Sequence, residues 1–155
     1  MPDNISQLQE HIRDAIKELY RESSFSELYK SNAYECVFSH RIAVYLEQFF
    51  SEQGFVVDCE YNKDFSNDDN GKRGDDGQSI RPDIIVHKRG GDRNNNLILI
   101  EVKKCGYKNK KAKKDIEKIK NCQNLGYDLC VFVGLRKKEA DAVWVNLGSE
   151  HEIIK

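Results

Sequence analysis

Two neighbouring apolar segments of this chain each carry an acidic residue at one end. The first reads Arg81-Pro82-Asp83-Ile84-Ile85-Val86, and the second reads Leu97-Ile98-Leu99-Ile100-Glu101-Val102-Lys103. Short apolar runs bounded by turn residues are typical of buried strands. The residues between the two runs are rich in Gly and Asn, which suits a hairpin turn. We therefore predict two paired strands, 83–87 and 97–103, joined by a turn over 88–96.

The rest of the chain shows further helical and strand patterns. Apolar residues spaced three and four apart predict a first helix that begins at Asn4 or Ser6 and is interrupted near Ser23 and Ser24. A second predicted helix ends at Gly54. Residues 62–79 are polar and Gly-rich with nothing to bury, so we expect a mobile loop there. The predicted helices cover about 5–29, 32–53 and 111–123, and the remaining predicted strands cover 55–61, 129–134 and 141–147.

This order of elements predicts a single α/β domain over residues 1–155, with a mixed β-sheet flanked by helices. An N-terminal helix (about 5–29) precedes a core (about 32–135), and a C-terminal strand (about 141–147) follows. Within the core, a meander of three strands leads through a helical crossover to a fourth, which makes the sheet mixed. A chain of 155 residues has room for one such core and little more.

Charge is distributed unevenly along the chain, although the net charge is only −1. Residues 1–60 contain eleven Asp and Glu against five Lys and Arg, whereas residues 103–120 contain nine lysines and two acids. A basic segment on a near-neutral protein indicates either a local anionic partner or an ordinary solvated helix face.

The cysteines and the apolar segments bear on the compartment. The five cysteines form no Cys-x-x-Cys pair, and their positions within apolar runs predict reduced, small core residues. No stretch approaches the length of a membrane span, so we expect no membrane partner. Together these features favour a cytoplasmic protein.

The acidic ends of the two predicted strands suggest a metal site. Glu101 and Lys103 are two residues apart, so their side chains leave the same face of a strand, and Asp83 meets them if the two strands pair. Two carboxylates beside an ammonium group would form a site for Mg²⁺ or Mn²⁺ with Asp83 and Glu101 as ligands. In this site Lys103 would position the attacking water and stabilise charge on a phosphate, because two nearby anions oppose the loss of its proton.

An alternative is that both acids lie at strand ends in solvent. The apolar residues Leu97 and Leu99 on the face of Glu101 argue against it, because a lone acid among buried apolar side chains costs free energy unless it is paired or binds a metal. An ion pair between Glu101 and Lys103 would be another way to meet that cost.

With Pro82-Asp83 on one strand and Glu101-Val102-Lys103 on the next, the chain resembles the PD-(D/E)XK nuclease superfamily. That group includes restriction endonucleases, Holliday-junction resolvases and small stand-alone nucleases, and the resemblance covers about residues 32–134. It implies an αβββαβ restriction-endonuclease-like core, to which the N-terminal helix is added. It also implies a Mg²⁺-dependent endonuclease that hydrolyses DNA phosphodiester bonds, commonly as a homodimer, without excluding RNA.

The resemblance also extends to the second predicted helix. Members of the superfamily often carry an acidic residue there that points into the active site, and Glu35 is the matching position, seven residues before Ile42 on the apolar stripe. The catalytic set is then Glu35, Asp83, Glu101 and Lys103. His40 would be an accessory residue, since similar stand-alone proteins have a His-Arg pair at this point, and a surface histidine is the alternative.

Basic residues around these positions would bind the nucleic acid through salt-dependent phosphate contacts that do not depend on base sequence. Tyr61 and Tyr107 would stack on a base or be ordinary half-buried tyrosines. The basic residues are Arg41, Arg81, Lys104, Lys108, Lys110, Lys111, Lys113 and Lys114.

Two other functions remain open from the sequence. The chain is either a nucleic-acid-binding module that does not cleave, or a protein-interaction scaffold whose acidic N-terminal helices form the interface. Because no separate target-recognition domain fits in this length, a nuclease would recognise substrate structure or depend on a partner protein for specificity.

Overall fold

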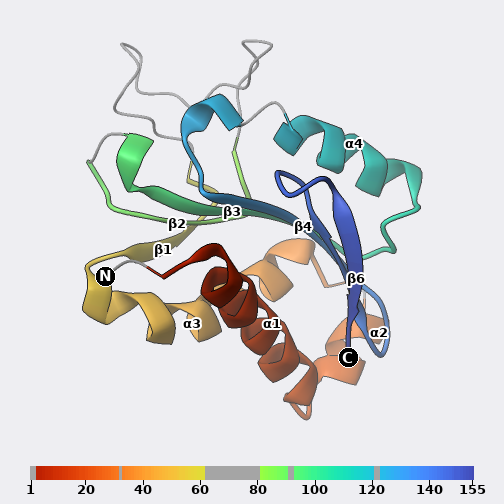
Figure 1. Ribbon diagram of the computed structural model, residues 1–155. Coiled ribbons are helices and arrows are strands. Elements are labelled where there is room, and N and C mark those ends of the chain that lie inside the picture. Colours follow the sequence, from red (N-terminus) through yellow and green to blue (C-terminus); the bar gives the residue numbers. More distant parts are fainter. Residues whose placement is uncertain (1–2, 32, 62–80, 91–92, 121–122) are drawn as a thin grey trace.

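The computed structural model describes residues 3–31, 33–61, 81–90, 93–120 and 123–155 (Figure 1). The predicted loop over 62–79 lies outside these ranges. The helices are α1 (Ile5–Arg21), α2 (Phe25–Lys30), α3 (Glu35–Phe50) and α4 (Lys110–Lys120). The strands are β1 (Val56–Cys59), β2 (Ile84–His87), β3 (Asn96–Lys103), β4 (Leu129–Leu135), β5 (Ala140–Trp144) and β6 (Glu150–Ile154).

The strands form one sheet of six in the order β1-β2-β3-β4-β5-β6. Every neighbouring pair is antiparallel except β3 and β4, which are parallel and are connected through α4. A parallel connection needs such a crossover, whereas antiparallel strands do not. The predicted mixed sheet flanked by helices is therefore confirmed as an α/β arrangement.

Helices cover both faces of the sheet, with α1 and α3 on one face and α4 on the other (Figure 1). Alternate residues of a strand supply the two apolar clusters, because side chains leave a strand on opposite faces in turn. Ile98 and Ile100 of β3 pack with the residues of α1 and α3, while Leu99 packs with Ala112 and Ile119 of α4. The face that carries Leu99, Glu101 and Lys103 is thus the face that α4 covers.

Leu97 departs from this alternation, and the sequence-based expectation that it shares the face of Glu101 is wrong. The register between β2 and β3 shifts at Val86 and His87, so Leu97 is an extra residue in the ladder. Such a bulge displaces the alternation by one position. Leu97 consequently packs in the cluster on the α1 and α3 side.

The helix boundaries follow the local signals in the sequence. Asn4 is the N-cap of α1 and forms a capping box with Gln7, in which each side chain bonds the other residue's backbone N–H. The predicted interruption lies at residues 22–24, between α1 and α2. Gly54 ends the turn after α3 with a φ of 78°, which suits glycine.

Two further sequence-based expectations are wrong. The segment predicted over 141–147 is not the last strand, because β6 follows it and pairs with β5. Three of the five residues of β6 are charged or His, so the segment has no apolar pattern that would predict a strand. As an edge strand, β6 pairs with a neighbour on one side only and tolerates these polar residues. The cysteines were expected in the core, but Cys36 and Cys59 are exposed; among the described cysteines only Cys130 is fully buried.

None of the helices within the described ranges has the length and apolar character needed to cross a membrane.

Candidate active site

Asp83 and Glu101 face each other across two antiparallel strands. Ile84 lies opposite Ile100 in the ladder, so the residue before Ile84 stands opposite the residue after Ile100. The backbone N–H of Val102 donates a hydrogen bond of 2.7 Å to Oδ2 of Asp83, which holds this carboxylate over the end of β3. The carboxyl groups of Asp83 and Glu101 are close enough to share a proton through a hydrogen bond.

Glu101 is a buried acid, with only 3% of its surface exposed. Burial raises the pKa of Glu101 to about 8, and the neighbouring negative charge of Asp83 adds to this rise. The ammonium of Lys118 lies 3.3 Å from Oε1 of Glu101 and works in the opposite direction. Lys118 is 40% exposed, so water screens its charge and it only partly offsets the burial.

Lys103 lies on the same face, between two carboxylates. Its Nζ is 3.1 Å from Oδ2 of Asp115 on α4 and 3.7 Å from Oε1 of Glu35 on α3. Burial alone would lower the pKa of Lys103, but Asp115, Glu35 and Asp83 outweigh it and raise the pKa. Lys103 is therefore a cation at neutral pH.

Glu35 is the first residue of α3 and reaches the same cluster from the other face of the sheet. Its Oε2 accepts a hydrogen bond of 2.7 Å from the backbone N–H of Lys104, and its Oε1 faces Lys103. The side chain is 41% exposed, so it lies at the rim and not in the interior. The four residues predicted as catalytic therefore meet at one end of β2 and β3, which are interior strands of the sheet.

Asp115 and Lys118 belong to this cluster, although the sequence-based set did not include them. They are three residues apart on α4, a spacing that places side chains on one face of a helix. Ile116 and Ile119 occupy the neighbouring positions of that face. Their positions beside Ile116 and Ile119 in the sequence could have identified them as residues that face the sheet. The many other lysines of α4 made this position hard to recognise.

The predicted nucleic-acid contacts fall into two groups. Arg41 is engaged by other side chains of the protein, because its Nε lies 2.8 Å from Oε1 of Glu22 and its guanidinium lies over Tyr45. Lys104 donates a hydrogen bond to the backbone oxygen of Ser31. The other predicted contacts have exposed side chains, as does His40; they are Arg81, Lys108, Lys110, Lys111, Lys113 and Lys114.

Arg81 is two residues before Asp83 in the sequence, but among the described residues it pairs with a different acid. Its guanidinium is 3.8 Å from Glu60, and both side chains are more than half exposed. Such an exposed pair contributes little to stability. Arg81 thus keeps a guanidinium at the protein surface beside β2.

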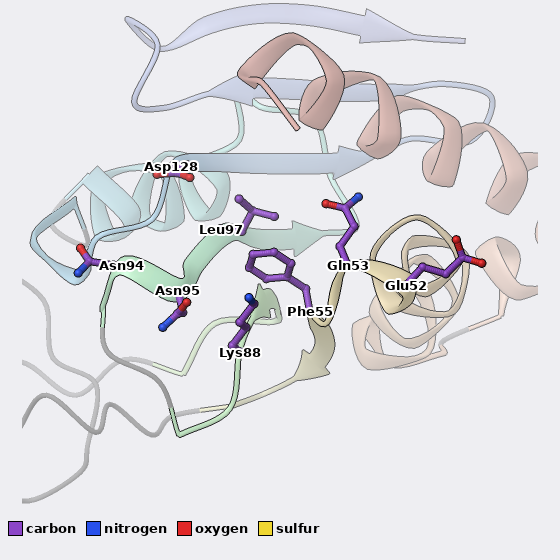
Figure 2. A pocket seen from close by; sticks show the side chains of 8 residues that line it. All are labelled: Glu52, Gln53, Phe55, Lys88, Asn94, Asn95, Leu97 and Asp128. Carbon is purple, nitrogen blue, oxygen red and sulfur yellow. The ribbon is translucent and has the colours of Figure 1, made fainter. Parts of the chain in front are cut away.

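A separate cavity of about 570 Å³ lies at the opposite end of β3, around Leu97 (Figure 2). Lys88 and Phe55 form one wall, with the ammonium of Lys88 4.9 Å from the centre of the Phe55 ring. Its two acids, Glu52 and Asp128, lie on different sides of the view and do not approach each other (Figure 2). This cavity lacks the paired carboxylates of the cluster around Glu101.

The donor set at Asp83 and Glu101 consists of two carboxylates. Within the part of the chain that is described, no group of three or more His, Cys, Asp or Glu side chains is arranged to bind a metal ion. Mg²⁺ retains several waters and commonly takes only one or two protein carboxylates besides substrate phosphate. Two acids in contact, one of them buried, fit that requirement.

Comparisons of this chain with models of protein families, with curated proteins and with solved structures find no match. The function of the chain is therefore inferred from its own geometry.

Proposed function

We propose that this chain is a metal-dependent endonuclease that hydrolyses DNA phosphodiester bonds at a PD-(D/E)XK site. The observation that carries the proposal is that Asp83 and Glu101 face each other across β2 and β3, with Glu101 only 3% exposed and its pKa raised by burial and by Asp83. Keeping a buried carboxylate next to a second one costs free energy, and a divalent cation between them would remove that cost. Without a ligand, two neighbouring carboxylates at the ends of core strands would lower the stability of the fold.

The order of the elements supports the same proposal. From α3 onward the chain runs α3, β1, β2, β3, α4, β4, with three antiparallel strands and a fourth parallel to the third. This is the αβββαβ order expected of a restriction-endonuclease-like core. Asp83 lies immediately before the second of these strands and Glu101 lies on the third, where that core would have its acids.

Asp83 and Glu101 would hold Mg²⁺ or Mn²⁺ through carboxylate oxygen, the ligand that these hard cations prefer. Val102 orients Asp83 through its backbone N–H, and the apolar surroundings of Glu101 keep bulk water away from its carboxylate. When bound, the metal would lower the pKa of a water and offset charge on the scissile phosphate.

Lys103 would serve as a fixed positive charge that orients water and stabilises negative charge on the phosphate. A general base must lose its proton near neutral pH, and the carboxylates around Lys103 raise its pKa. Glu35 and Asp115 lie 3.7 Å and 3.1 Å from its ammonium and would fix its position. These contacts favour an electrostatic role for Lys103.

The exposed lysines at the start of α4 and just before it would contact the phosphate backbone of DNA. They lie on the same side of the sheet as Lys103, because α4 covers that face. Contacts of this kind are independent of base sequence. A homodimer stays a prediction from the resemblance. A partner protein that supplies specificity stays a prediction from the length of the chain.

Cleavage of supercoiled plasmid tests the proposal. We expect nicking in Mg²⁺ or Mn²⁺, none in EDTA, and a loss of at least about 100-fold in rate for Glu101→Gln and for Asp83→Asn. Glu47→Gln, which changes an exposed acid of α3, is the matched control and should leave the rate unchanged. Binding of DNA without cleavage under all these conditions would instead indicate a non-cleaving nucleic-acid-binding module.

A further inference from the structure

A second pocket lies on the same face of the sheet as the carboxylate cluster, near the same end of the strands but at the edge strand β6. It has a volume of about 400 Å³, and Tyr107, Lys108, Arg136, His151 and Ile153 are among the residues that line it. Neither the predicted catalytic set nor the metal site uses any of them.

The sheet register places this pocket in line with the catalytic residues. Lys103 pairs with Gly134, Gly134 with Asp141, and Asp141 with Ile153, so these residues form one row across β3, β4, β5 and β6. Paired residues point to the same face of a sheet. At about 4.8 Å between strands, Ile153 is roughly 14 Å from Lys103.

The neighbouring row connects Glu101 to the same pocket. Glu101 pairs with Phe132, Phe132 with Val143, and Val143 with His151. Phe132 and Val143 are buried members of the apolar cluster that includes Ala112 and Ile119 of α4, whereas His151 is exposed on the edge strand β6. The pocket thus lies at the end of both rows that begin in the catalytic cluster.

Gly134 allows the chain after Lys103 to reach this pocket. A Cβ at Gly134 would lie 2.4 Å from the backbone oxygen of Cys105, so the segment after β3 crosses directly over β4 at this glycine. The crossing brings the backbone N–H of Tyr107 to Oδ2 of Asp141, to which it donates a hydrogen bond of 3.2 Å. The short segment from Lys103 to Tyr107 is therefore fixed at both ends, by β3 and by the hydrogen bond to Asp141.

Asp141 organises the pocket but has no oxygen to spare for a ligand. It is 3% exposed, and besides Tyr107 it accepts hydrogen bonds from Arg136 at 3.0 Å and from His151 at 2.9 Å. Burial would raise the pKa of Asp141, but the hydrogen bonds from His151, Tyr107 and Arg136 outweigh it and lower the pKa. Asp141 is thus an ionised carboxylate whose charge is balanced by its neighbours.

The surfaces that Asp141 leaves available are aromatic, apolar and cationic. The rings of Tyr107 and His151 stack on each other, with centres 3.8 Å apart and planes 19° from parallel. Ile153 is one of the few large apolar side chains exposed in the described part of the chain, at 47%. Lys108 lies over the Tyr107 ring at 5.9 Å, and the exposed lysines of α4 follow it directly.

We propose that this pocket binds an unpaired nucleobase of the nucleic-acid substrate, which stacks on the outer face of the Tyr107–His151 ring pair and contacts Ile153 while Lys108 contacts the adjoining phosphate. The inference rests on the proposed nuclease function and adds to it a substrate class, nucleic acid with a single-stranded segment near the scissile bond. A base presents its face to aromatic side chains only when it is unstacked from its own strand. The run of lysines beside the pocket favours a polyanion over an apolar peptide.

Binding in EDTA tests the pocket independently of cleavage. The full chain is titrated into a fluorescent single-stranded 20-mer and into a hairpin duplex of the same length, and anisotropy is recorded. We expect Tyr107→Leu to weaken single-strand binding by roughly 5-fold or more and duplex binding by less than roughly 2-fold, since one base stack is lost. Tyr107→Phe keeps the ring and should bind as the unchanged protein does.

Two further measurements keep the test decisive. Ile153→Glu places an acid in the pocket without touching Tyr107, and it should cause the same selective loss if Tyr107→Leu fails to fold. With 2-aminopurine scanned along the single strand, we expect quenching by the unchanged protein at one position and loss of that quenching in Tyr107→Leu. Equal losses on single strand and duplex, or no loss on either, would overturn the subsite.

The outcomes also separate the subsite from the nuclease proposal. If the unchanged protein nicks plasmid with metal but Tyr107→Leu binds single strands normally, the subsite is wrong and the nuclease proposal stands. If the unchanged protein binds neither single strand nor duplex, both proposals fail together.

Discussion

The ammonium of Lys103 lies 3.1 Å from the carboxylate of Asp115, a residue of the helix that follows it in the chain. This contact joins β3 to α4 at the centre of the candidate active site. Glu35 approaches the same ammonium from α3 at 3.7 Å. Lys103 is consequently held by helices from both faces of the sheet, which fixes a side chain that would otherwise have many rotamers.

The first prediction concerns Asp115 as a positioning residue. We expect Asp115→Asn to lower the rate of plasmid nicking about 10-fold, as for partners that orient a residue in contact with substrate. The loss should appear in kcat and not in KM, because Asp115 acts through Lys103, and Asp115→Glu should restore part of it. Glu117→Gln, on the exposed side of the same helix, is the control. A rise in KM with an unchanged kcat would contradict this role.

The second prediction follows from the buried carboxyl of Glu101. Its pKa is about 8 in the folded protein against an ordinary value of 4.5, so between these pH values the folded state binds a proton that the unfolded chain releases. The free energy of unfolding should therefore fall as pH rises through this window, by about 1.4 kcal/mol per pH unit at most, and level off above pH 8.

Urea unfolding in EDTA at several pH values measures this effect. Glu101→Gln cannot ionise, so it should match the unchanged protein near pH 4.5 and become more stable than it by pH 9. Added Mg²⁺ should then stabilise the unchanged protein at pH 8 but not Glu101→Gln. Parallel pH profiles for the two proteins would show that Glu101 carries no such burial cost.

The third prediction concerns the chain crossing at Gly134. A methyl group there would meet the backbone oxygen of Cys105 at 2.4 Å, and backbone cannot move aside as a flexible side chain does. We expect Gly134→Ala to lower the free energy of unfolding by about 1–3 kcal/mol. Gly54→Ala is the comparison, because it has open space and only its φ of 78° opposes the change, at a cost of about 1 kcal/mol. A smaller loss at Gly134 than at Gly54 would argue against a tight crossing.

The sequence predicted the fold well where its patterns were local. The apolar runs of β3 and β4, the capping residue Asn4 and the terminating Gly54 each carry a signal within a few residues. The edge strand β6 was missed, because it is formed by backbone hydrogen bonds to β5 and its mostly polar side chains show no apolar pattern. Periodicity reports burial, and an edge strand buries little.

The candidate site shows the same division. Asp83, Glu101 and Lys103 were predicted to converge because two short strands fix their faces. The partners Asp115 and Lys118 depend on how α4 docks over β3, which no local pattern specifies. The link from Glu101 to His151 runs through three strand pairs and depends on β6, so it could not be inferred before the sheet order was known.

The last prediction concerns the lysines of α4 as a phosphate-binding surface. Lys110 and Lys114 are exposed and lie one turn apart, so together they would contact neighbouring phosphates. Lys17 and Arg21 have the same spacing on α1, on the opposite face of the sheet (Figure 1). The two pairs remove equal charge when changed to Ala, and only the pair on α4 faces the side of the sheet that carries Lys103.

Binding of duplex DNA at a series of salt concentrations distinguishes the pairs. Each lost phosphate contact lowers the slope of log K against log salt by about 0.9, so the Lys110→Ala and Lys114→Ala double variant should lower it by up to about 2. The Lys17→Ala and Arg21→Ala double variant should leave the slope unchanged. Equal slopes for both double variants would mean that α4 presents an ordinary solvated face, because net charge alone would then explain the binding.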